Sequence, residues 1–262
     1  MHLMMAVTAL HDRYLNLHFN GTTRSIEAYH WTQGVHLLNQ RLLQPFNGAD
    51  REAVWMSAIL VSCMVSANLE ASTPELSWPL KLPDHTDLEW IRLSRGKTLF
   101  HPVTGPRRPE PPLEPSIHSS KHQELLHSLN ILVDSNSAPG AYNPYHQVWQ
   151  GLSSLLLFNC DSTSISRFNG IIGYMEESFL HLLEAKDPLA MLLLSLWYAK
   201  TSEFQWWLSR RAALECQAIC IYLETHHSDK REIVDLLWYS KSSCGLGGIM
   251  MDSHQYNIEA YS

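Results

Sequence analysis

Apolar residues recur at three- and four-residue spacing along most of this chain, with polar residues between them. That period is typical of amphipathic α-helices, which bury one face and expose the other. Residues 51–70 and 164–186 carry long examples, and similar segments follow one another from residue 3 to residue 241. Sustained alternation of apolar and polar residues, the mark of a half-buried strand, is absent from the sequence. The pattern therefore predicts an all-α protein, a bundle of about nine helices.

Residues 187–200, DPLAMLLLSLWYAK, are the most apolar segment, and residues 189–198 carry no charge. A membrane-spanning helix needs roughly 17–25 such residues, so this segment is too short to cross a bilayer. Its ends carry the signals of an ordinary helix, because Asp187 suits the N-cap, Pro188 the first turn and Lys200 the C-terminal end. A helix that is apolar on every side belongs in a protein interior. We therefore expect a buried central helix here and no membrane span.

The chain length of 262 residues suits one large domain. We expect residues 1–262 to form a single helical domain whose helices surround an apolar cavity. Between Pro102 and Pro115 six prolines occur within fourteen residues. Proline lacks the backbone N–H and clashes with the preceding helical turn, so this segment predicts a loop at about residues 101–117. Such a loop is either a surface excursion or a lid over the core.

The composition is rich in apolar and aromatic side chains, with 45% hydrophobic and 17% charged residues, nine Trp, nine Met and ten Tyr. Some of this apolar surplus is expected to line a cavity or a partner surface instead of filling the core. The net charge is −7, from 19 Lys and Arg against 26 Asp and Glu. Binding to nucleic acid draws most of its affinity from basic side chains on phosphates. The charge balance therefore argues against direct binding to nucleic acid.

The five cysteines form no C-x-x-C pair, and most lie in apolar contexts, where a free thiol behaves as a small hydrophobic side chain. Cys216 and Cys220 are four residues apart on a predicted apolar helix, and we interpret them as core residues in preference to a redox or metal pair. The N-terminal segment lacks the basic start of a signal peptide. These features predict an intracellular protein without a metal, cytoplasmic or, if it is a regulator, nuclear.

No nucleotide-binding, zinc-protease or serine-hydrolase motif occurs in the sequence, and no cofactor is expected. Aromatic and Met residues instead gather on five predicted helices. Helix bundles build ligand sites from side chains on facing helices, and such pockets are mostly apolar and aromatic. We therefore predict a site for a hydrophobic small molecule, a terpenoid, a polyketide or a sterol-like compound. The candidate ligand-binding residues are Trp55, Met56, Trp149, Met175, Trp197, Trp206 and Trp207.

Several segments share the order of elements found in one family. They include the Ala-Leu-His end of the first helix, the Asn-x-x-Asp cap before residues 51–70, residues 87–100 and residues 187–245. Together these segments resemble the C-terminal regulatory domain of fungal zinc-binuclear-cluster transcription factors of the sterol-uptake-control type. The resemblance implies an all-helical domain that holds a hydrophobic ligand between its helices. Family members also carry a six-cysteine zinc cluster that binds DNA, and this sequence has no such cysteines. The DNA-binding half is therefore expected to be missing.

Two hypotheses about function follow. In the first, the domain is a cofactor-free cyclase of the Diels–Alderase kind, which folds a terpenoid or polyketide into a reactive conformer and donates a hydrogen bond to it. The candidate donors are His146, Tyr174 and Tyr198. In the second, the domain is the ligand-sensing half of a regulator. Both hypotheses leave open whether the protein forms a homodimer.

Overall fold

The computed structural model describes residues 1–15, 21–45, 48–104, 120–136, 142–202 and 204–246. Helices account for all regular structure in these residues, and no strand occurs among them, so the all-α prediction is confirmed. The α-helices are α1 (His2–Tyr14), α2 (Gly21–Leu42), α3 (Gly48–Ala67), α4 (Glu89–Thr104), α5 (Ser120–Ser135), α6 (His146–Ser153), α7 (Ile165–Tyr174), α8 (Glu177–Glu184), α9 (Pro188–Thr201), α10 (Trp206–His226), α11 (Arg231–Val234) and α12 (Trp238–Ser243). The short 3-10 helices are η1 (Pro74–Leu76) and η2 (Asp235–Leu237).

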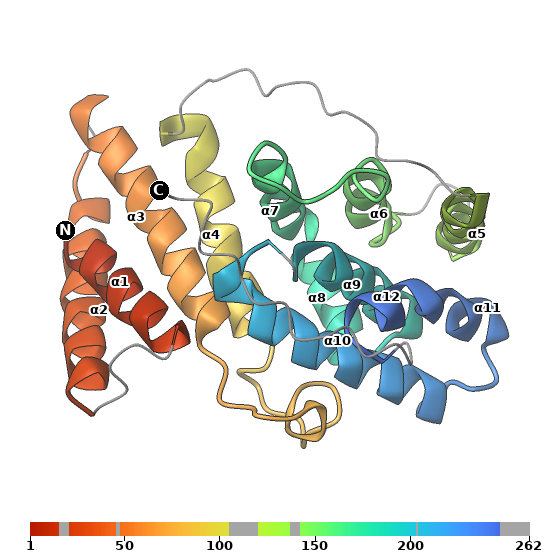
Figure 1. Cartoon of the computed structure of the whole chain (residues 1–262). Coiled ribbons are helices and arrows are strands. Elements are labelled where there is room, and N and C mark those ends of the chain that lie inside the picture. The colour runs from red at the N-terminus through yellow and green to blue at the C-terminus, as the bar shows by residue number, and fades with distance from the viewer. Residues whose placement is uncertain (16–20, 46–47, 105–119, 137–141, 203, 247–262) are drawn as a thin grey trace.

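The helices fall into two groups that α10 connects. α1 to α4 lie together on one side of the molecule, and α5 to α9 lie on the other with α11 and α12 (Figure 1). α1 packs against α2, and α3 packs against α4. α10 packs against α9 in the second group and against α3 in the first. Side chains on α10 can therefore reach both groups.

α9 is the centre of the main hydrophobic core, as the sequence predicts. Every residue of this helix except Lys200 is buried. The Asp187 Oδ1 atom accepts a hydrogen bond from the Ala190 amide at 2.9 Å, and Pro188 occupies the first turn. Lys200 at the other end donates to the Phe158 carbonyl oxygen at 2.8 Å. The predicted cap, first turn and buried position of this helix are confirmed.

The N-cap of α9 yields a prediction for stability. Replacing Asp187 with Ala leaves the Ala190 amide without its side-chain partner. We expect the free energy of unfolding to fall by about 1 kcal/mol, the usual cost of losing a capping side chain. Urea denaturation followed by circular dichroism measures this change. Asp187→Asn retains the capping oxygen and is expected to recover most of the loss, whereas equal losses in both variants would contradict a capping role.

A smaller core joins α1 to its neighbours. Ala6 and Leu10 of α1 pack with Met64 of α3. Where α1 meets α2, a Cβ atom added to Gly34 of α2 would lie 2.6 Å from the Leu3 side chain. Because no Cβ atom tolerates that distance, glycine at this position allows α1 and α2 to pack closely.

The continuous pattern over residues 164–186 predicts one long helix, and the structure divides it into α7 and α8. The backbone leaves the helical conformation at Met175, where ψ is 66°, and Glu176 is extended, with ψ at 171°. Met175 is fully buried at this break. The break lets Phe168 on α7 and Phe179 on α8 both reach the main core. Burial of two apolar faces in different directions therefore outweighs the local periodicity.

The predicted proline loop is wrong at its start. α4 continues to Thr104, so residues 101–104 are helical, and the rest of the predicted loop, residues 105–117, lies outside the described part of the chain. Pro102 stands near the C-terminal end of the helix.

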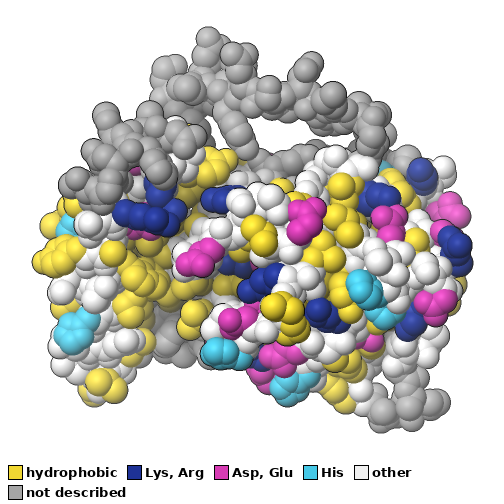
Figure 2. Space-filling model, turned by 90° about the horizontal axis from the view of Figure 1, so that it is seen from below, with side chains coloured by type: hydrophobic (Ala, Val, Ile, Leu, Met, Phe, Trp, Pro, Cys, Tyr) yellow, Lys and Arg dark blue, Asp and Glu magenta, His cyan; other side chains and the backbone are white. Residues whose placement is uncertain are grey.

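The length and apolarity of each helix bear on the membrane prediction. Within the described ranges, no helix is both long enough and apolar enough to cross a membrane. α9, the most apolar helix, has 14 residues. On the face seen from below, basic and acidic side chains are intermixed, and hydrophobic side chains gather toward the α1–α2 end (Figure 2).

Candidate functional site

A partly open cleft lies where the end of α3, the start of α4 and the middle of α10 meet. Its volume is about 660 Å³, within the ~300–1,000 Å³ typical of small-molecule sites. The segment between α3 and α4, including η1, forms its outer wall. The described residues that line it are Val65, Asn68, Leu69, Glu70, Ala71, Leu76, Ser77, Trp78, Lys81, Thr86, Asp87, Glu89, Trp90, Leu93, Arg211 and Glu215. We call this site the α3–α4–α10 cleft.

Arg211 of α10 lines this cleft and holds the C-terminal end of α3 in place. Its Nε atom donates to the Ser66 carbonyl oxygen at 2.9 Å, and a terminal nitrogen donates to the Asn68 carbonyl oxygen at 2.7 Å. Carbonyl groups at a helix C-terminus lack helical partners, so an arginine there satisfies them and complements the helix dipole. The neighbouring Arg210 donates to the Ala71 carbonyl oxygen at 2.9 Å. Two consecutive arginines therefore fix the segment that begins the outer wall.

Glu215 lies one helical turn after Arg211 and forms a buried ion pair with it. The Arg211 and Glu215 side chains are 6% and 2% exposed, and the contact between them is 2.5 Å. The other Glu215 oxygen accepts a hydrogen bond from the Tyr198 hydroxyl of α9. Burial raises the pKa of Glu215, and the positive charge of Arg211 opposes that rise. Burial and the Glu215 charge raise the pKa of Tyr198, so its hydroxyl keeps its proton and acts as a donor.

Trp90 of α4 forms the inner wall of the cleft. Its ring is stacked on Trp197 and Tyr198, with centroids 6.2 and 6.3 Å away. The Arg211 guanidinium lies over the same ring at 4.9 Å, a cation–π arrangement. Trp90 is only 4% exposed, and its indole Nε1 donor has no hydrogen-bond partner among the described residues. A buried donor without a partner costs free energy, so an acceptor that reached this atom would be favourable, although the atom itself has almost no exposed surface.

Most charged side chains of the cleft are paired with other protein groups. Lys81 contacts Asp87 at 2.5 Å, and Glu89 accepts a hydrogen bond from Arg92 at 3.0 Å. Arg211 and Glu215 neutralise each other in the same way. The wall is thus more ionic than the apolar cavity that the sequence predicts. Trp90 contributes a buried donor that lacks a partner among the described residues.

The predicted ligand-binding residues do not line this cleft. Three of them are buried in the main core: Trp149, Met175 and Trp197. Four are partly buried or exposed: Trp55, Met56, Trp206 and Trp207. The closest connection is through Trp197, which stacks on the far side of the Trp90 ring from within the core and donates from Nε1 to the Phe168 carbonyl oxygen at 2.9 Å.

The three predicted donors lie in different environments. His146 is exposed on α6, and Tyr174 is 46% exposed at the end of α7. Tyr198 is fully buried on α9 and reaches the cleft only through its hydrogen bond to Glu215. The structure therefore separates Tyr198, which is enclosed in the core, from the two exposed side chains.

Sequence reasoning missed the side chains that define the cleft. Arg211 and Glu215 carried a usable signal, because an acidic and a basic residue four apart on a largely apolar helix indicate an internal pair. Trp90 carried none, since its position in residues 88–100 resembles any other apolar position. Its unpaired indole donor appears only when α4 is packed against α9 and α10.

Comparisons with known proteins identify no family for this chain. No family model, no curated protein and no solved structure matches the chain. The cleft geometry and the residues themselves therefore carry the functional argument.

Proposed function

We propose that this protein is a ligand-binding domain that takes a neutral, mostly apolar small molecule into the α3–α4–α10 cleft. The observation that carries the proposal is that Trp90 lines the cleft and that its buried Nε1 donor has no hydrogen-bond partner among the described residues. An indole N–H is a donor only, so it selects a carbonyl, ether or hydroxyl oxygen. Polyketides, oxidised terpenoids and sterols carry such an oxygen on an apolar frame.

The other walls of the cleft suit an apolar frame of this kind. Trp78, Leu69, Leu76 and Leu93 contribute apolar surface around the donor. Ligand sites typically combine such surface with a few polar groups that fix orientation. The paired charges of the cleft would have to lose their partners to bind an ionic ligand, which favours a neutral one.

The test compares cholestanone, which has one carbonyl oxygen, with cholestane, the matching hydrocarbon. Trp90→Phe keeps an aromatic ring and removes the N–H donor. One hydrogen bond contributes about 0.5–1.5 kcal/mol, so we expect this variant to weaken cholestanone binding about three- to tenfold. Cholestane binding is expected to change little. Equilibrium titration followed by intrinsic fluorescence measures both dissociation constants.

Trp149→Phe is the matched control, because it removes the Trp149 hydrogen bond to the Asn130 side chain, 3.2 Å long, away from the cleft. We expect cholestanone binding to be unchanged in this control. Weaker binding in Trp149→Phe but not in Trp90→Phe would contradict the cleft and favour the pocket that the sequence predicts. Identical behaviour of cholestanone and cholestane in the unaltered protein would contradict recognition of the oxygen.

A cyclase remains the second candidate function, and it uses the same donor. A hydrogen bond from Trp90 Nε1 to a carbonyl conjugated with an alkene would lower the barrier to an intramolecular cycloaddition. Two π bonds become two ring σ bonds in that reaction, so no co-reactant is consumed. Incubation with a linear polyene that carries a conjugated carbonyl tests it: product formation above the uncatalysed rate, reduced in Trp90→Phe, supports a cyclase. Binding without turnover supports a sensor.

An intracellular location is part of the proposal. The five cysteines form no disulfide with one another, which is typical of proteins in a reducing compartment. A ligand of a regulator or a substrate of a biosynthetic enzyme would meet the protein inside the cell.

A further inference from the structure

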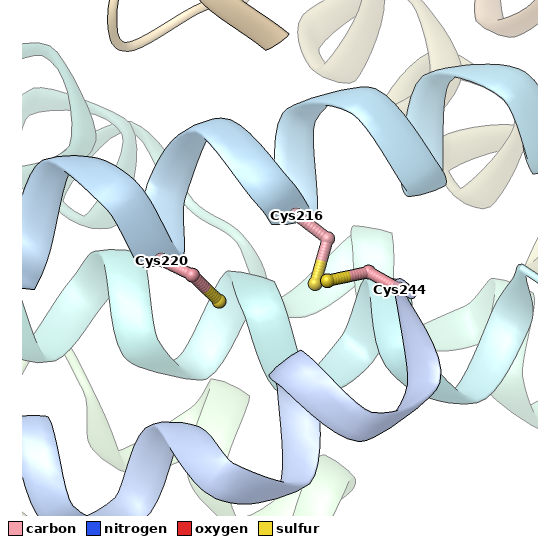
Figure 3. A group of neighbouring side chains, drawn as sticks. All are labelled: Cys216, Cys220 and Cys244. Carbon is pink, nitrogen blue, oxygen red and sulfur yellow. The ribbon is translucent and has the colours of Figure 1, made fainter. Parts of the chain in front are cut away.

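The structure brings three cysteines from two helices to one buried place. Cys216 and Cys220 lie one turn apart on α10, and Cys244 directly follows α12. Their sulfur atoms all lie within 4.8 Å of one another. The Sγ atoms of Cys216 and Cys244 point toward each other, and Cys220 lies on the same side of α10 (Figure 3). Sequence spacing gives no sign of this cluster, because Cys244 is distant in the chain and does not share a motif with the other two.

All three cysteines are enclosed. Cys216 and Cys220 are 1% and 0% exposed, and Cys244 is 7% exposed. The burial of Cys216 and Cys220 agrees with the core positions that the sequence predicts. The arrangement therefore places three sulfur atoms side by side in an otherwise apolar surrounding.

Cys244 is held in place by its backbone. Its amide donates to the Ser240 carbonyl oxygen at 3.0 Å, and its own carbonyl oxygen accepts from the Gln217 side chain of α10. Gly245 follows with φ at +85°, a conformation that glycine adopts without strain. The Leu246 amide then donates to the Lys241 carbonyl oxygen at 3.0 Å. This turn fixes the direction in which the Cys244 sulfur points.

We propose that Cys216, Cys220 and Cys244 form a three-thiolate binding site for a soft metal ion, and that this ion is Cu(I). Metal–sulfur bonds of ~2.3 Å around one ion place three sulfurs ~4 Å apart, so the cluster needs only small side-chain movements to close. Thiolates are the ligands that Cu(I) and Zn²⁺ prefer. Structural zinc takes four protein ligands, and the metal-ligating cluster among the described residues offers three. Cu(I) accepts three thiolates in a plane, which favours copper.

The charge of the complex is partly offset nearby. Binding of Cu(I) replaces the thiol protons, which are released to solvent. The Lys241 ammonium donates to Glu224 at 2.7 Å, which is the main cause of its raised pKa, and the charges of Cys220 and Cys244 contribute as well. The bound ion would join α12 to α10 and so stabilise the C-terminal part of the described fold.

The test begins with the full chain, reduced and loaded anaerobically with tetrakis(acetonitrile)copper(I), and uses bicinchoninate as a competitor. We expect one Cu(I) per chain and a rise in melting temperature. Cys216→Ala and Cys244→Ala are expected to bind at least 100-fold more weakly. Cys63→Ala, which alters a cysteine outside the cluster, is the matched control and is expected to bind as the unaltered protein does.

X-ray absorption of the copper-loaded, unaltered protein needs no variant and so does not depend on whether the alanine variants fold. Three sulfur neighbours at ~2.3 Å would support the site. Nitrogen or oxygen neighbours, or Cu(I) binding that is unchanged in Cys244→Ala, would overturn it. Zn²⁺ retained in preference to copper would overturn the choice of ion. A Cys216–Cys244 disulfide in the isolated protein, with no metal bound after reduction, would overturn the site in favour of a redox pair.

Discussion

Replacing Arg211 with Met lowers the free energy of unfolding by about 3–5 kcal/mol, the cost of leaving one partner of a buried ion pair alone. The substitution retains most of the apolar side-chain stem. It removes the positive charge beside Glu215 and the donors to the Ser66 and Asn68 carbonyl oxygens. It also removes the cation–π contact with Trp90. Chemical denaturation followed by circular dichroism at neutral pH measures the loss.

Arg210→Met is the matched control, because this neighbouring arginine is exposed and donates one hydrogen bond, to the Ala71 carbonyl oxygen. We expect it to cost less than about 1 kcal/mol. The double variant Arg211→Met/Glu215→Gln removes the unpaired carboxylate as well and is expected to recover part of the loss. Equal losses in the two arginine variants would contradict a specific role for the buried pair.

The loss in Arg211→Met depends on pH. Burial already raises the pKa of Glu215 above its unfolded value, so the folded state retains a proton that the unfolded state gives up. Stability therefore decreases as the pH rises through the window above the unfolded pKa. Without Arg211 the folded pKa rises further, which enlarges that decrease. The deficit of the variant is thus expected to be largest at neutral pH and to shrink as the pH is lowered and Glu215 becomes protonated.

Replacing Trp197 with Ala has the second large expected effect, a loss of about 3–5 kcal/mol, because it empties the volume of a fully buried aromatic ring. Trp197→Phe removes the hydrogen bond to the Phe168 carbonyl oxygen together with part of the buried ring volume and is expected to cost about 1–3 kcal/mol. Urea denaturation gives both values. Titration of the Phe variant with cholestanone then distinguishes an effect on stability from an effect on ligand binding. A Phe variant that keeps its stability but binds cholestanone poorly would show that Trp197 contacts the ligand, as the sequence predicts.

The helices around α9 were predictable because their signals are local. Asp187, Pro188 and Lys200 mark the ends of α9 within one segment, and the apolar residues between them require burial on every side. The break at Met175 was not predictable from periodicity, because the apolar pattern continues through it. It depends on where the core lies relative to α7 and α8, which is a property of the packed protein.

The α3–α4–α10 cleft was not predictable, because its parts come from distant segments. Trp90, Asn68 and Arg211 meet only when α10 packs against α3. The aromatic content of the sequence indicated that a pocket could exist. It did not distinguish aromatic residues packed in the core from those that line the cleft. Trp149 and Trp197 look like ligand contacts in the sequence and lie in the main core in the structure. Trp90 is buried to the same degree as Trp149, and only the missing partner of its indole nitrogen sets it apart.

Native mass spectrometry of the purified protein, combined with solvent extraction and identification of what is released, tests the central proposal most directly. The account predicts one bound molecule per chain that is neutral, mostly apolar and carries at least one acceptor oxygen, and it predicts lower occupancy in Trp90→Phe. A protein that carries no such molecule, and whose melting temperature does not rise with cholestanone or other oxygen-bearing lipophiles, would contradict a ligand-binding function for the cleft.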